Sequence, residues 1–69
     1  MELDKLVHMA NRIGEFFDSF PDRAQAVAGV SDHLIKFWTP AMRQQLQDAV
    51  DRQQAKGLSP LVAQALTKR

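Results

Sequence analysis

Apolar residues recur every three or four positions in the first part of the chain, which is the spacing of one face of an α-helix. The pattern begins at Leu3, and the charged residues fall on the opposite side. Met9, Phe16 and Phe20 widen the apolar side to roughly half of the cylinder, more than a helix needs to cover one core. We therefore predict a helix over 3–19 with some apolar surface available to another partner.

Prolines indicate where the later helices begin. Pro21 suits the first turn of a helix, because its missing N–H group would have no partner there. Thr39 followed by Pro40, and Ser59 followed by Pro60, each combine a capping residue with a proline that fits the first helical position. These signals predict three further helices, approximately over 21–37, 40–55 and 60–67.

Three isolated glycines punctuate these helices. Gly57 suits a left-handed residue that ends the third helix. Gly14 and Gly29 lie inside predicted helices, where glycine costs about 1 kcal/mol relative to alanine. Two interpretations remain open for this pair: close approach of two helices, or simple tolerance.

The predicted fold class is all-α, a small bundle of three to four helices that forms one domain over 1–69. A domain of about 60 residues buries only about 60% of the surface that its unfolded chain exposes, so its core is marginal. The chain has no cysteine and only two histidines, and it therefore lacks the usual disulfide or metal support. Association with a partner is the remaining common route to stability.

Charge and hydropathy narrow the classes of partner. The formal net charge is +1, with acids and bases mixed along the chain, so neither nucleic acid nor a membrane surface is expected. The absence of a signal peptide, a long apolar span and cysteine favours a cytoplasmic protein. A helix-turn-helix protein would need a basic reading face, yet Arg43 and Arg52 lie among glutamines and acids. Self-association through the excess apolar surface is a stronger alternative.

The sequence offers little catalytic chemistry. Zinc normally requires three or four ligands, whereas His8 lies on a polar helix side and His33 at the edge of an apolar side. We interpret His8 as a surface residue and His33 as a boundary residue that hydrogen-bonds a neighbour or a partner. Serine and threonine already have capping or packing roles, so no catalytic, cofactor-binding or metal-binding residue is predicted.

Trp38 is the largest side chain and lies at the junction of the second and third helices. Tryptophan and arginine are the residue types that most often dominate binding energy at interfaces. Arg43, one turn into the next helix, is the companion that we expect. The alternative is that Trp38 closes the small core while Arg43 is solvated, and spacing alone leaves both interpretations open.

Three blocks of the sequence, LVHMANRIGEFF at 6–17, HLIKFWTPAMR at 33–43 and GLSPLV at 57–62, together extend over nearly the whole chain. In content and order they resemble the delta subunit of bacterial NAD-dependent formate dehydrogenases. The most distinctive pieces are MANRI at 9–13 and HLIKFWTPAMR at 33–43. The stretch at 44–56 carries little recognisable signal.

The resemblance implies a non-catalytic accessory subunit of a cytoplasmic complex that oxidises formate to carbon dioxide and reduces NAD to NADH. In such complexes the catalytic alpha subunit carries molybdenum on a bis-pterin guanine dinucleotide cofactor, with iron–sulfur clusters. The beta and gamma subunits supply FMN, the NAD site and further clusters. The delta subunit is expected to support assembly or stability of the alpha subunit. The present chain carries no cofactor in this scheme, since it lacks the thiolates of an iron–sulfur site.

The resemblance also directs attention to the residues that could contact the partner. They lie in the two most distinctive blocks, and no catalytic role accompanies them. The predicted partner-binding residues are Asn11, Arg12, His33, Phe37, Trp38, Met42 and Arg43.

Overall fold

The computed structural model describes residues 2–67, which contain four α-helices and no strand. The predicted all-α class is confirmed. The helices are α1 (Leu3–Asp18), α2 (Arg23–Phe37), α3 (Pro40–Asp51) and α4 (Pro60–Thr67).

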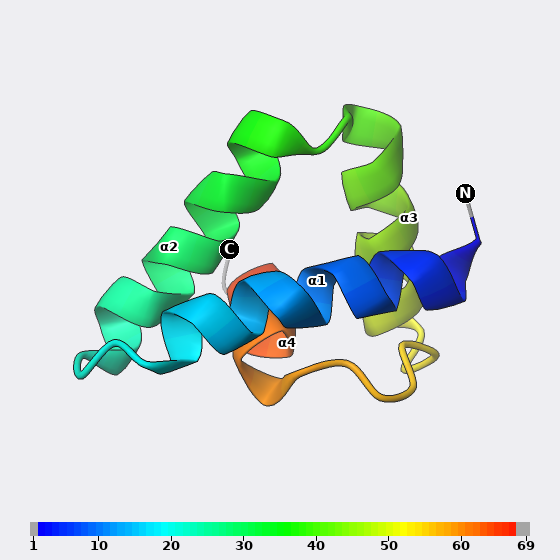
Figure 1. The fold of residues 1–69 in the computed structure, drawn as a ribbon. Coiled ribbons are helices and arrows are strands. Elements are labelled where there is room, and N and C mark those ends of the chain that lie inside the picture. Colours follow the sequence, from blue (N-terminus) through cyan, green and yellow to red (C-terminus); the bar gives the residue numbers. More distant parts are fainter. Residues whose placement is uncertain (1, 68–69) are drawn as a thin grey trace.

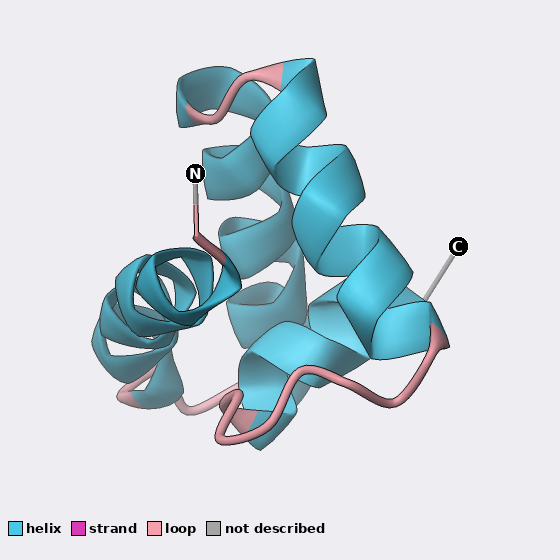
Figure 2. Ribbon diagram, turned by 90° about the vertical axis from the view of Figure 1, so that its right-hand side faces the viewer, coloured by secondary structure: helices cyan, strands magenta, loops and turns pink. Residues whose placement is uncertain are grey.

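The four helices pack as an arch on a two-helix base (Figure 1). Helices α2 and α3 rise from opposite ends of α1 and meet at a short turn, while α4 lies behind the middle of α1. Every pair of helices is in contact, and Figure 2 shows α1 nearly end-on beside the other three. The short α4, expected to be marginal alone, docks on the bundle through its buried Leu61 and Val62.

One hydrophobic core joins all four helices. Trp38, between α2 and α3, is only 6% exposed and belongs to this core. Of the two interpretations of this tryptophan, the structure therefore supports the core. The same cluster contains aliphatic side chains from every helix. The largest fully buried side chains are Leu6, Leu34, Leu46, Leu61, Val30 and Val62.

The predicted start of α2 was wrong by two residues. The helix begins at Arg23, and Pro21 lies in the preceding turn. Asp22 is the N-cap, with extended backbone angles and a carboxylate that accepts a hydrogen bond of 2.9 Å from the Ala24 N–H group. A short acidic side chain satisfies an orphan donor directly, and this capping bond sets the boundary.

The predicted ends of α1 and α3 also need correction. Helix α1 ends at Asp18 instead of residue 19, and α3 ends at Asp51 instead of residue 55. After α3, Gln53 takes a left-handed conformation with φ 58°, and Gln54 donates a 2.7 Å hydrogen bond to the carbonyl of Ala49. Together with the bond from the Gln53 N–H group to Val50 O, this is a Schellman motif.

Gly57 is left-handed as predicted, with φ 82°, but it does not end α3. It lies in a separate turn in which the Leu58 N–H group donates to Ala55 O. The sequence pattern misplaced the helix end because glutamine rarely adopts the left-handed conformation, whereas glycine adopts it readily.

The two helical glycines allow close packing. A Cβ atom on Gly14 would lie 2.9 Å from Cγ2 of Val62 and 3.0 Å from Oγ of Ser59, so this glycine lets α1 approach α4. A Cβ atom on Gly29 would collide with the ring of Phe17. Close approach is therefore the right interpretation for both glycines. Gly14 contacts α4, and Gly29 contacts the aromatic ring of Phe17.

Trp38→Ala should lower the free energy of unfolding by about 3–5 kcal/mol, because it leaves a large cavity in the core. That loss approaches the whole stability of a domain of this size, roughly 3–10 kcal/mol. Phe37→Ala is the matched control: this adjacent ring is 72% exposed, and its loss should change stability by about 0.5 kcal/mol or less. Urea unfolding followed by circular dichroism measures both. Equal losses from the two variants would contradict the core position of Trp38.

Gln53→Gly should raise the free energy of unfolding by about 0.5–1 kcal/mol, because glycine relieves the left-handed conformation at the end of α3. Gln54→Gly, one residue later, relieves nothing and should be neutral or destabilising. Thermal unfolding of the two variants beside the parent chain tests this prediction. A loss of stability in Gln53→Gly would show that the motif is not formed.

Candidate partner-binding surface

Asn11 connects α1 to the loop that enters α4. Its side-chain Nδ2 donates a 2.9 Å hydrogen bond to the carbonyl of Gly57, and its Oδ1 accepts a 2.7 Å bond from the Ser59 N–H group. Both amide functions are thus used within the chain, at backbone groups 46 and 48 residues away. The structure places this predicted partner-binding residue in a structural role that aligns α4 on α1.

Arg43 lies in α3 and caps the end of α2. Its Nη1 donates to the carbonyl of Trp38 at 2.8 Å and to that of Ile35 at 3.2 Å. These carbonyls belong to the last turn of α2, where a cation is favoured by the helix dipole. At the same junction Thr39 caps α3 by accepting a 3.2 Å bond from the Met42 N–H group, as its place before Pro40 predicted.

Four of the seven predicted partner-binding residues therefore make their contacts within this chain. Trp38 belongs to the core, Met42 packs against it half-buried, and Asn11 and Arg43 bond to backbone groups. The other three lie together at the surface of α1 and α2. They are Arg12, His33 and Phe37.

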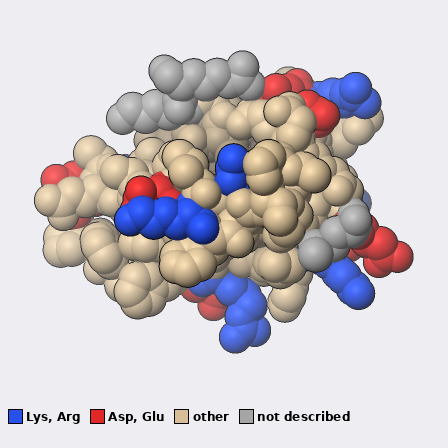
Figure 3. Space-filling model, turned by 90° about the horizontal axis from the view of Figure 1, so that it is seen from above, with Lys and Arg blue, Asp and Glu red and all other residues tan. Residues whose placement is uncertain are grey.

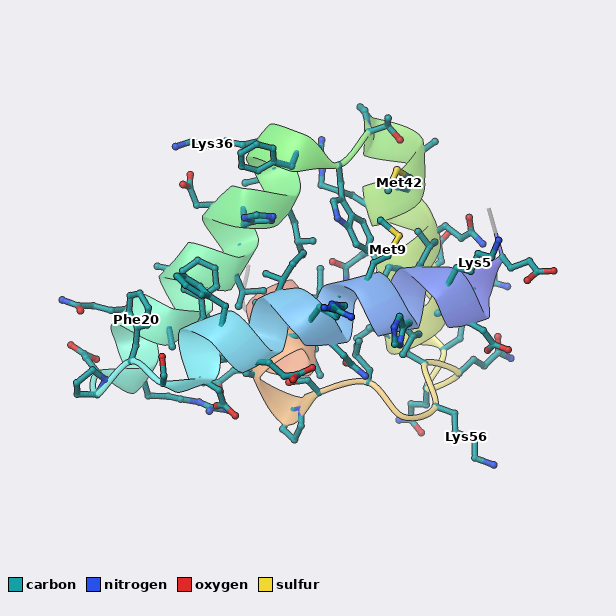
Figure 4. All side chains as sticks on the ribbon, viewed as in Figure 1. Lys5, Met9, Phe20, Lys36, Met42 and Lys56 are labelled. Carbon is teal, nitrogen blue, oxygen red and sulfur yellow. The ribbon has the colours of Figure 1, made fainter. Side chains whose placement is uncertain are left out.

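Aromatic rings from α1, from α2 and from the turn between them form one continuous group, which we call the aromatic face: Phe16, Phe17, Phe20, His33 and Phe37. The Phe17 ring centroid lies 5.2 Å from that of Phe20 and 6.5 Å from that of His33. The His33 ring in turn lies 4.6 Å from the Phe37 ring. Figure 4 shows Phe20 at the α1–α2 end of this group.

Three rings of the aromatic face, those of Phe16, Phe20 and Phe37, are exposed, while Phe17 and His33 are half-buried; Met9 lies exposed on the same side of α1. Phe16 is 65% exposed and Phe37 72%, and Phe20 and Met9 are each exposed by more than a third. An apolar hollow of about 360 Å³ lies between α1 and α2, lined by Arg12, Ile13, Phe16, Phe17 and His33. Large apolar side chains gathered in this way indicate a binding surface rather than random exposure.

The predicted partner-binding residues do not include Phe16, Phe17 or Phe20, although Phe16 and Phe20 widen the predicted apolar side of the first helix. The signal was present, since the apolar side of the first predicted helix is wider than one core requires. Periodicity shows that a helix has surplus apolar surface, but it does not identify the side chains that other helices leave uncovered. Packing of α4 behind α1 decides that, because it covers the side of α1 that bears Gly14.

Charges are dispersed over the surface, as Figure 3 shows for one side of the molecule. The ion pairs between Arg23 and Asp18, at 3.5 Å, and between Lys36 and Asp32, at 3.0 Å, are both well exposed. Exposed pairs of this kind contribute little to stability, typically about 0–1 kcal/mol. The distinctive chemistry of this surface is therefore aromatic and apolar.

Within residues 2–67 no group of three or more histidine, cysteine, aspartate or glutamate side chains is arranged to hold a metal ion. His8 is exposed on α1, as its place on the polar side predicted, and His33 packs between aromatic rings. No helix in this part of the chain combines the length and the apolar character that crossing a membrane requires.

These features define a small all-α protein with a complete core and an uncovered aromatic face. The chain matches the family model described as NADH-dependent formate dehydrogenase delta subunit FdsD over residues 5–66, and it belongs to that family. The resemblance to the delta subunit family is thereby confirmed. Neither the curated proteins nor the solved structures include a match to this chain.

Asn11→Ala should lower the free energy of unfolding by about 1–3 kcal/mol, because it removes two hydrogen bonds and leaves the Ser59 N–H group without its acceptor. Amide hydrogen exchange should accelerate most in α4, which this residue holds in place. Glu15→Ala, an exposed change one turn later on α1, is the control and should have little effect. Unchanged exchange in α4 would contradict the structural role of Asn11.

Proposed function

We propose that the chain is an accessory subunit that supports assembly or stability of the catalytic alpha subunit in a cytoplasmic formate dehydrogenase. The complex would also contain the beta and gamma subunits and would convert formate and NAD to carbon dioxide and NADH. Family membership supports the assignment to formate dehydrogenase. The aromatic face supports a role in binding another subunit. The observation that carries the proposal is this uncovered face on a chain whose core is already closed.

The energetics favour a protein partner for this face. Covering a large apolar side chain completely is favourable by about 1.5–3 kcal/mol, and Phe16, Phe20 and Phe37 each have ring surface available. Aromatic side chains of this kind commonly dominate binding at interfaces. A marginal core would gain from the same contact, since binding to the folded state alone stabilises that state.

In this proposal the cofactors belong to the partner subunits. Molybdenum on the bis-pterin guanine dinucleotide cofactor, the iron–sulfur clusters and FMN would be held by the larger chains. The present chain contains no cysteine to offer as a cluster ligand. Its contribution to the reaction would be indirect, through the folded state of the subunit that it contacts.

Partner contact should involve the exposed Arg12 and Phe37 together with the half-buried His33 between them. Asn11, Trp38, Met42 and Arg43 would act by maintaining the fold that presents them. This division changes the choice of test variants, because Trp38→Ala and Arg43→Ala would disturb folding as well as binding. Phe37→Ala probes the surface without that complication.

Self-association is the second candidate, since the same aromatic face could pair with that of another copy. A nucleic-acid-binding role is less favoured, because Nη1 of the half-buried Arg43 in α3 is already bonded to carbonyls at the end of α2. Sedimentation of the isolated chain distinguishes self-association from the accessory role. A stable dimer favours self-association, and a monomer favours the accessory role.

Removing this chain from its host should lower the amount of assembled alpha subunit, its molybdenum content and formate oxidation severalfold. Phe16→Ala combined with Phe37→Ala should restore them poorly when supplied in place of the parent chain. Ile35→Ala is the matched control, since this apolar residue is 62% exposed on α2 but lies outside the aromatic face. The readouts are the alpha subunit level, bound molybdenum and formate-dependent NADH formation. Normal values without the chain would refute the proposed function.

A further inference from the structure

We propose that the aromatic face binds an amphipathic helix of the partner subunit, with acidic residues along one edge of that helix. This inference rests on the proposed function for the existence of a partner. It specifies which surface of this chain binds the partner, the secondary structure of the bound segment and the sign of that segment's charge.

The spacing of the rings matches the pitch of a helix. Phe20, Phe17, His33 and Phe37 form a row whose successive centroids are 5.2, 6.5 and 4.6 Å apart. One helical turn rises about 5.4 Å, so side chains at steps of three and four residues on a bound helix can pack over successive rings. The hollow of about 360 Å³ beside Phe16 accepts one larger apolar side chain of that helix.

The chemistry of the face also selects a helix over an extended segment. Residues 2–67 contain no strand, so this part of the chain has no sheet edge to which an extended peptide could add. Aromatic rings supply few partners for backbone N–H and C=O groups, which are costly to bury unpaired. A helix satisfies these groups internally and can lie on an apolar surface without that cost.

Two cations border the exposed apolar side of α1. At about 100° per residue, Lys5 and Arg12 lie seven positions apart on one edge of the stripe that bears Met9 and Phe16. Figure 4 shows Lys5 and Met9 on the N-terminal half of α1. Both cations are exposed, and neither has an ion-pair partner among residues 2–67. Arg12 lines the hollow beside Phe16, so aspartate or glutamate on the bound helix would complement it, and Lys5 extends the positive edge along α1 away from the row of rings.

A second copy of the chain fits this edge less well. It would bring the same two cations and would have to supply acids beside its own aromatic face. On α2 the neighbouring acid, Asp32, is already paired with Lys36 at 3.0 Å. On α1, Asp4 and Glu15 lie further round the polar side of the helix than Arg12. Charge complementarity therefore favours a different chain that carries an acidic edge.

The test places the photo-crosslinking residue p-benzoylphenylalanine at position 16 or 37 of the full chain, expressed in its host with the whole complex. Both positions are exposed aromatic sites, so the replacement leaves the core intact. Position 35, equally exposed but outside the face, is the control. We expect positions 16 and 37 to crosslink to one helix of a partner subunit that carries acidic residues, at least tenfold more than position 35 does.

Charge reversal tests the acidic edge separately. Arg12→Glu and Lys5→Glu should each weaken binding to the purified complex lacking this chain by about threefold to tenfold at low salt, and less at high salt. Lys56→Glu is the matched control, because Lys56 is exposed on the loop between α3 and α4, away from α2 (Figure 4). Equal effects of the three reversals would overturn the charge assignment.

The crosslinks separate this inference from the proposed function. Crosslinks from positions 16 and 37 to a second copy, or to a non-helical partner segment, would overturn the inference. Partner crosslinks from position 35 alone would overturn it while leaving the accessory role intact. If no position crosslinks to another subunit and the chain fails to co-purify with the complex, both the inference and the proposed function are wrong.

Discussion

The burial of Trp38 between α2 and α3 is the contact on which the arrangement of this small bundle depends. The indole lies where the chain turns, and Thr39 and Pro40 begin the next helix immediately after it. Arg43 reaches back from α3 to the last carbonyls of α2, so the two helix ends are joined by hydrogen bonds as well as by packing. The arch formed by α2 and α3 then encloses a core that α1 and α4 complete.

This junction also determines which side chains remain outside. Phe37 and Trp38 are adjacent in sequence, yet the first is 72% exposed and the second 6%. The turn after α2 directs the indole toward the core, while Phe37 continues the outer face of α2 beside His33. A chain of 69 residues has little apolar surface to spare, so leaving several phenylalanines uncovered weakens it as an isolated domain. That deficit is what a partner can supply.

Much of the fold could be predicted from local signals. The spacing of apolar residues and the positions of proline indicated four helices, and the cap at Thr39 was correctly placed. The start of α2 and the end of α3 were misplaced because Asp22 and Gln53 act through specific backbone geometry that composition does not reveal. The candidate site was predicted less completely. Its blocks mixed surface residues with Asn11 and Arg43, whose partners lie elsewhere in the fold.

The sequence by itself determined the class of fold, the approximate extent of the helices and membership of the delta subunit family, because these follow from periodicity, capping residues and local motifs. Only the tertiary structure decided which side chains of the motif from His33 to Arg43 are buried and which are exposed. Periodicity defines the faces of a helix but not the helices that cover them, and hydrogen bonds such as that of Asn11 depend on groups 46 residues away. For the same reason, only the tertiary structure shows that Trp38 is buried in the core and that Phe37 lies at the surface.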